Sequence, residues 1–175
     1  MNISDFFESN GERINKSKKE HVFKQGDMDG NLYFIQSGLL KAYYLTFDGK
    51  EFVKSFLLPG DIIGSLRASH TNEPSSFNLL CLESSQLIKL KFEQLYQAAL
   101  KDTEMTEVVF ELLINLALKK ERREFEFLCC TPEQRYALLK ERTPLLLEKV
   151  TQTDIAKYIG ITAVALSRII NRSKA

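Results

Sequence analysis

The residues best suited to chemistry lie near the end of this 175-residue chain, in the stretch TQTDIAKYIGITAVALSRIINR, residues 151–172. Arg168 is the most informative, because a guanidinium group can donate two hydrogen bonds to guanine O6 and N7. The hydroxyl groups of Thr162 and Ser167 can bond backbone phosphates. These side chains predict contact with DNA. The predicted DNA-binding residues are Thr151, Thr162, Ala163, Val164, Ser167, Arg168 and Asn171.

The same stretch has the pattern of two short helices joined by a tight turn. Thr151 and Asp154 form a start that resembles a capping box. Gly160 permits the sharp turn that helix-turn-helix units commonly contain, and Thr162 can cap the second helix. Apolar residues then anchor that helix and leave the predicted DNA-binding side chains outside. The alternative is a generic helical hairpin in which Arg168 is only solvated. The anchoring residues are Ala165, Leu166, Ile169 and Ile170.

The distribution of charge fits this prediction. The whole chain carries a formal charge of +1, but residues 131–175 hold eight Lys and Arg against four acids, or 8 − 4 = +4. The preceding 130 residues therefore carry 1 − 4 = −3. A basic end on a near-neutral chain is consistent with a nucleic-acid-binding domain.

Residues 21–90 predict many short strands. Runs of β-branched and aromatic residues alternate with turn signals, and Asp48-Gly49 between two apolar runs predicts a hairpin. Residues 65–76 are expected to form a loop or a helix. Regular short strands of this kind are typical of a β sandwich or barrel.

Residues 91–128 lack Gly and Pro and predict helix, with Asp102 or Thr103 as the cap of a long second segment. Apolar residues then recur at spacings of four, three and four, as in a coiled-coil seam. Further apolar positions let one face pack on the sheet while another meets a partner, and the alternative is packing only within its own subunit. The predicted dimer residues are Met105, Val109, Leu112 and Leu116.

Residues 131–175 predict several short helices. Thr131-Pro132 with Gln134 is a good helix start, because Thr caps, Pro occupies the first turn and Gln completes a capping box. The expected organisation is α+β. It comprises a strand-rich domain in residues 1–101, to which the resemblance described below assigns a jelly-roll sensor role, a dimerisation helix and hinge in residues 102–130, and a helix-turn-helix domain in residues 131–175.

The chain resembles the catabolite-activator (Crp/Fnr) family of transcription regulators over roughly residues 15–172. The stretch YFIQSGLLKAYYLTFDGKEFVKSFLLPGDIIG resembles the first half of a cyclic-nucleotide-binding jelly roll. ERREFEFLCCTPEQRYALL resembles the passage from the dimer helix to the DNA-binding domain, and GITAVALSRI resembles the recognition helix. The resemblance implies a homodimer that binds two-fold-related double-stranded DNA, with RNA polymerase as a further partner.

The effector pocket departs from the family pattern. Family members that bind cyclic nucleotides use Gly-Glu-Leu and Arg-Ser/Thr-Ala, in which Glu bonds the ribose and Arg pairs with the phosphate. The corresponding stretches here are Gly64-Ser65-Leu66 and Ser75-Ser76-Phe77, so both charged ligands are missing. Arg67 lies nearby, but nothing in the sequence orients it. We therefore expect that cAMP does not bind tightly; the pocket is empty, degenerate or adapted to another small ligand.

Two further departures concern DNA. Many relatives carry Glu where this chain has Val164, and Glu reads cytosine N4, so a different DNA consensus is expected. Relatives also finish with a β-hairpin wing, whereas only Ser173, Lys174 and Ala175 follow Arg172. The wing is therefore expected to be missing, either naturally or by truncation.

Other classes of function are less consistent with the sequence. The main alternative is a cyclic-nucleotide-binding-like module that controls a partner protein without binding DNA. No nucleophile elbow, Gly-rich phosphate loop or paired carboxylates indicate an enzyme, and two distant histidines predict no metal site. The three cysteines, of which none precedes Cys81, indicate neither a disulfide framework nor an N-terminal iron–sulfur site. Without an apolar membrane span or signal peptide, a cytoplasmic location is expected.

Overall fold

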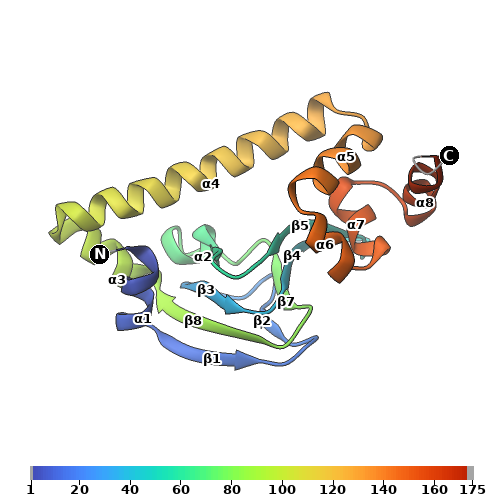
Figure 1. Cartoon of the computed structure of the whole chain (residues 1–175). Coiled ribbons are helices and arrows are strands. Elements are labelled where there is room, and N and C mark those ends of the chain that lie inside the picture. The colour runs from blue at the N-terminus through green and yellow to red at the C-terminus, as the bar shows by residue number, and fades with distance from the viewer. Residues whose placement is uncertain (1, 173–175) are drawn as a thin grey trace. The chain divides into compact units, whose positions relative to one another are not determined.

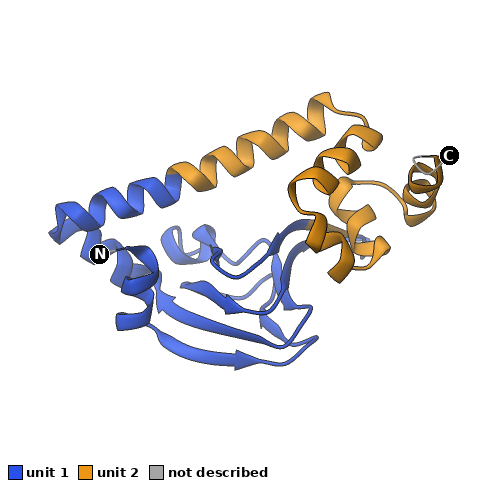
Figure 2. Cartoon of the chain, viewed as in Figure 1, with its two compact units in different colours: residues 1–50, 54–113 blue, residues 51–53, 114–175 orange. Residues whose placement is uncertain are grey.

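The computed structural model describes residues 2–172, which divide into two compact units (Figure 2). Of these described residues, unit 1 contains 2–50 and 54–113, and unit 2 contains 51–53 and 114–172. The long helix α4, Thr103–Cys129, contributes residues to both.

Two four-stranded antiparallel sheets form a sandwich in the first part of the chain, as Figure 1 shows. One sheet has the order β1-β8-β3-β6 and the other the order β2-β7-β4-β5. The strands are β1 Glu12–Lys16, β2 His21–Phe23, β3 Asn31–Ser37, β4 Leu40–Leu45, β5 Glu51–Leu57, β6 Ile62–Gly64, β7 Asn78–Cys81 and β8 Ser85–Lys91. The predicted hairpin at Asp48-Gly49 is confirmed as the β4–β5 turn, where Gly49 has a φ of +80°.

Strand β3 packs against apolar residues on both of its faces. Successive side chains of a strand point to opposite faces. Tyr33 and Ile35 accordingly pack in the core between the sheets, while Leu32 and Phe34 contact a second apolar cluster. This two-sided burial explains why Leu32 to Ile35 form an uninterrupted apolar run rather than an alternating pattern.

Helices α1 and α3 and the start of α4 build the second cluster. Phe7 of α1, Leu95 of α3 and Met105 of α4 are each at most 2% exposed. The helices of unit 1 are α1 Ile3–Asn10, α2 Leu66–His70, α3 Phe92–Lys101 and the first part of α4. The side chain of Asp102 accepts a hydrogen bond from the Glu104 amide at 3.0 Å, as a capping residue would.

The apolar face of α4 that the sequence predicts as a dimer seam packs at least in part on its own domain. Met105 is only 2% exposed and belongs to the second cluster, against which Val109 and Leu112 also pack. The spacing is that of one helix face, but this face covers its own domain. Leu116 is half-buried. Large apolar side chains are exposed elsewhere on α4: Phe110, Leu113, Ile114 and Leu118.

Unit 2 adds four short helices after α4. They are α5 Pro132–Arg142, α6 Pro144–Lys149, α7 Gln152–Ile159 and α8 Ala163–Arg172. The predicted capping box of α5 is confirmed, because Thr131 Oγ1 accepts from the Gln134 amide and Gln134 Oε1 accepts from the Thr131 amide. The α+β fold is therefore confirmed. The missing wing concerns residues 173–175, which lie outside the described residues.

Candidate nucleic-acid interface

Helices α7 and α8 form the predicted helix-turn-helix, with each cap where the sequence places it. Thr151 Oγ1 accepts from the Asp154 amide at 3.1 Å, and Thr162 Oγ1 accepts from the Ala165 amide at 3.2 Å. Gly160 ends α7 in the left-handed conformation, with a φ of +78°. This conformation favours glycine and turns the chain into α8.

The two faces of α8 differ as the sequence predicts. Leu166 is fully buried and Ile169 is 8% exposed, so both anchor the helix. Ala165 and Ile170 are half-buried. All seven predicted DNA-binding residues are exposed to solvent, with Val164 at 63%. They are Thr151, Thr162, Ala163, Val164, Ser167, Arg168 and Asn171.

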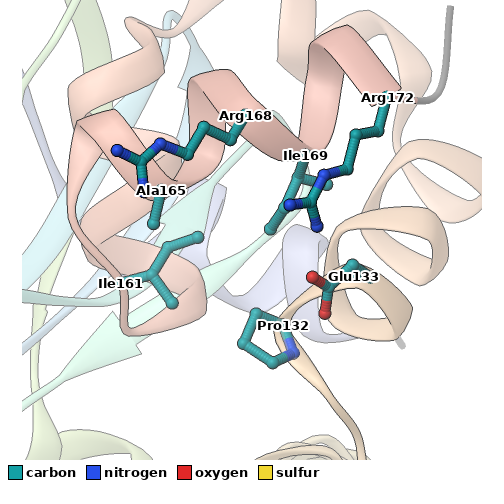
Figure 3. Close-up of a pocket in the computed structure, with 7 residues that line it drawn as sticks. All are labelled: Pro132, Glu133, Ile161, Ala165, Arg168, Ile169 and Arg172. Carbon is teal, nitrogen blue, oxygen red and sulfur yellow. The ribbon is translucent and has the colours of Figure 1, made fainter. Parts of the chain in front are cut away.

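A shallow hollow of about 230 Å³ lies between α8 and the beginning of α5. Figure 3 shows Arg168 near Ala165 at one side, while the side chains of Arg172 and Glu133 point toward one another at the other side. Arg172 and Glu133 were not among the residues that the sequence predicted. The position of Arg172 one helical turn after Arg168 was the available signal, since residues four apart share a helix face.

The predicted effector residues surround helix α2 and the loop that follows it, but they do not form a nucleotide site. Ser65 Oγ is close to the Ala68 amide and caps α2. The Arg67 guanidinium is paired with the Glu73 carboxylate, and both side chains are more than half exposed. Gly64 lies against β3, where a Cβ would approach the Asn31 carbonyl oxygen to 2.5 Å. Leu66 is exposed, Ser76 is half-buried and Ser75 is buried.

Phe77 corresponds to the Ala of the family's Arg-Ser/Thr-Ala motif. Its side chain packs in the core between the two sheets. Its side chain is 4% exposed, and its ring centroid lies 5.2 Å from that of Phe23 and 6.4 Å from that of Tyr44. Ser75 holds this segment by donating a hydrogen bond to the Phe77 carbonyl at 3.0 Å. With the phosphate-binding arginine absent and Arg67 paired, these residues do not fit a cyclic nucleotide.

The described residues show two other features that bear on function. Within residues 2–172, no group of three or more His, Cys, Asp or Glu side chains is placed to hold a metal ion. Among the helices of the same residues, none has the length and apolar character required to span a membrane.

Fold and sequence together define the class of this protein. A family model described as the cyclic nucleotide-binding domain matches residues 13–102, and the chain belongs to that family. The fold is shared with FixK2 from Bradyrhizobium japonicum, with a TM-score of 0.75 at 19% identity over 93% of this chain and 83% of that one. A CooA mutant from Carboxydothermus hydrogenoformans has a TM-score of 0.76 at 16% identity over 97% of this chain and 78% of that one.

Curated relatives match this chain beyond the residues that the family model covers. The anaerobic regulatory protein of Pasteurella multocida is 29% identical over 89% of this chain and 60% of its own length. The fumarate and nitrate reduction regulatory protein of Yersinia pestis is 26% identical over 89% of this chain and 66% of its own length. The resemblance to Crp/Fnr regulators is thereby confirmed, and this chain spans about 60–66% of these relatives.

Proposed function

We propose that this protein is a sequence-specific DNA-binding transcription regulator that acts as a homodimer. The observation that carries this proposal is the exposed face of α8, where Ser167, Arg168 and Asn171 lie opposite the buried anchors Leu166 and Ile169. A helix of this kind presents hydrogen-bonding groups to base edges in the major groove. The names of the curated relatives, which are regulatory proteins, support the same function.

The second recognition helix would come from a second copy of the chain, paired through α4. Phe110 is 62% exposed, Leu113 46% and Leu118 51%, although they lie on a well-formed helix. Phe110, Ile114 and Leu118 follow one another at spacings of four residues and Leu113 lies three residues after Phe110, so they line one side of the helix. An exposed apolar stripe of this kind is expected to be covered in solution. We propose that this face, rather than the seam predicted from the sequence, pairs the two copies.

The remaining assignments follow from this function. We divide the chain into a sensor domain in residues 1–101, a dimer helix and hinge in residues 102–130 and a DNA-binding domain in residues 131–175. DNA and a second copy are the main partners, RNA polymerase is a further partner, and the cytoplasm is the location. The described effector residues supply no cyclic-nucleotide site, so a gating ligand would be chemically different.

A mobility-shift assay with genomic fragments tests the proposal. Arg168→Ala should weaken binding by about tenfold to a hundredfold for each half-site that the dimer contacts, because a bidentate contact to guanine contributes about 1–3 kcal/mol. Lys140→Ala is a matched control, since Lys140 is an exposed cation on α5 outside the predicted interface. If neither the natural protein nor the variant shifts any fragment, a module that controls a partner protein becomes the better explanation.

A further inference from the structure

An alternating stack of cations and aromatic rings joins α4 to the helix-turn-helix within unit 2. The Arg123 guanidinium carbon lies 4.0 Å from the ring centroid of Tyr158 and 4.7 Å from that of Phe127. Arg135 of α5 lies 4.7 Å from the same Phe127 centroid. Guanidinium groups stack well on aromatic faces, so the order Tyr158, Arg123, Phe127, Arg135 is mutually attractive.

Hydrogen bonds fix the direction of the Arg123 side chain. Its Nη2 atom donates to the Tyr158 carbonyl at 3.0 Å, near the C-terminal end of α7, and to the Val53 carbonyl at 2.9 Å. Arg135 Nη1 donates to the Phe127 carbonyl at 3.2 Å. Arginine therefore combines planar stacking with directed donors, which lysine cannot reproduce.

The turn of the helix-turn-helix contacts the same aromatic ring. A Cβ at Gly160 would lie 2.9 Å from Phe127 Cε1, so the turn backbone approaches the ring edge closely. Arg142 of α5 also pairs with Glu126, the neighbour of Phe127 on α4. The last turns of α4 thus contact α5, α7 and the α7–α8 turn, and Phe127 and Arg123 make most of these contacts.

We infer that Arg123 is a positioning residue that sets the orientation of the recognition helix relative to α4. The inference rests on the proposed function, because it concerns a dimer paired through α4. Once two α4 helices are fixed to one another, the stack determines the separation and angle of the two α8 helices. Half-site spacing in the DNA mirrors that separation. Arg123 therefore acts on the choice of spacing rather than on contacts within a half-site.

The test measures binding of the full chain to DNA with two half-sites, by fluorescence anisotropy. The half-site comes from selection with the natural protein, and the DNA series changes the spacing by one, two and five base pairs or carries a single half-site. The natural protein should prefer one spacing by about tenfold or more over its neighbours. Arg123→Gln should reduce this preference to about threefold or less, with single-half-site affinity changed by less than about threefold.

Two further variants sharpen the result. Arg122→Gln removes the same charge from the adjacent, exposed position and should keep the natural spacing profile. Tyr158→Leu removes a ring of the stack but keeps the backbone carbonyl, and should flatten the profile as Arg123→Gln does. If thermal unfolding shows that Arg123→Gln does not fold, the spacing profile of Tyr158→Leu decides whether the stack positions α8.

The outcomes separate this inference from the proposed function. If the folded Arg123→Gln or Tyr158→Leu protein keeps the full preference for one spacing, the positioning role is wrong although the protein binds DNA. An equal loss of affinity for every DNA, single half-sites included, would also overturn it, because that result indicates damage to the domain. Failure of the natural protein to select any DNA would instead overturn the proposed function.

Discussion

Gly160 is the residue on which the turn between α7 and α8 depends. Its φ of +78° strains any other residue by about 1–2 kcal/mol, and a Cβ would also lie 2.9 Å from the Phe127 ring. Gly160→Ala should therefore lower the free energy of unfolding by about 2–4 kcal/mol, measured by urea denaturation. Gly49→Ala is the matched control, since Gly49 has a φ of +80° but nothing within 4 Å of its added Cβ. Equal costs would show that the Phe127 ring moves aside freely.

The stretch around Phe77 predicts that the first domain does not bind cyclic nucleotides. Its ring is packed in the sandwich core, and Arg67 is paired with Glu73. Calorimetry with cAMP should show no micromolar binding, either to the natural protein or to Phe77→Ala. That substitution should still cost about 3–5 kcal/mol of stability, because it leaves a cavity. Micromolar affinity in the natural protein would contradict this account of the pocket.

Residue-level prediction from sequence succeeded where local chemistry decides. The caps at Thr131, Thr151 and Thr162 and the turn at Gly160 each depend on neighbours within a few residues, and all four are observed. Arg123 escaped prediction because its ring partner Tyr158 lies 35 residues away. The local sequence around a basic residue in a charged run is the same whether its side chain is solvated or stacked on an aromatic ring.

At the scale of elements, α4 has two apolar faces, to which we assign different roles. Phe110 and Leu113 are exposed, whereas Leu112 packs on its own domain. Phe110→Asp with Leu113→Asp should convert a dimer into a folded monomer in sedimentation experiments, because a buried unpaired carboxylate is costly. Leu112→Ala should instead lower the unfolding free energy by about 1–3 kcal/mol, because Leu112 is only partly buried, and should leave the dimer intact.

A control variant separates the effect of disrupting the exposed apolar face from the effect of added negative charge. Arg122→Asp also adds negative charge at an exposed position of α4 and should leave the dimer in place. A natural protein that sediments as a monomer would remove the premise of this prediction. A double variant that remains dimeric would show that another surface pairs the copies.

The strands and helices differ in how well their sequences predict them. Apolar runs predicted β3, β4 and β5, and the absence of Gly and Pro predicted α3 and α4. Strand β1, ERINK, has a largely exposed and polar pattern, so it lacks the hydrophobic signal of a strand. Periodicity shows that α4 has an apolar face, but it does not show whether that face packs on a sheet or on a second copy of the chain.

Helix α1 was missed although its start carried a local signal. Asn2 and Asp5 form a capping box, and the buried residues Phe6 and Phe7 follow. Those two rings pack in the second cluster with Leu95 and Met105, which lie far along the chain. Short segments of this kind gain most of their stability from tertiary packing, which the sequence does not display.

At the scale of the whole molecule, pairing through α4 and recognition through α8 should be coupled. A dimer that holds one half-site presents its second α8 at a high effective concentration, which raises affinity by about 100-fold to 10,000-fold without any new contact. The monomeric variant of Phe110 and Leu113 should lose affinity for DNA with two half-sites by that factor. Its affinity for a single half-site should stay unchanged, because α8 itself is untouched.

Arg168→Ala provides the complementary profile for the same measurement. It should weaken binding to single and double half-sites alike, with the larger loss for the double site, because the lost contact occurs once in each copy. Fluorescence anisotropy on both DNAs therefore distinguishes a loss of dimerisation from a loss of contacts to the bases. If the monomeric variant bound two half-sites as tightly as the natural protein, each copy would act independently. Dimerisation through α4 would then have no part in DNA recognition.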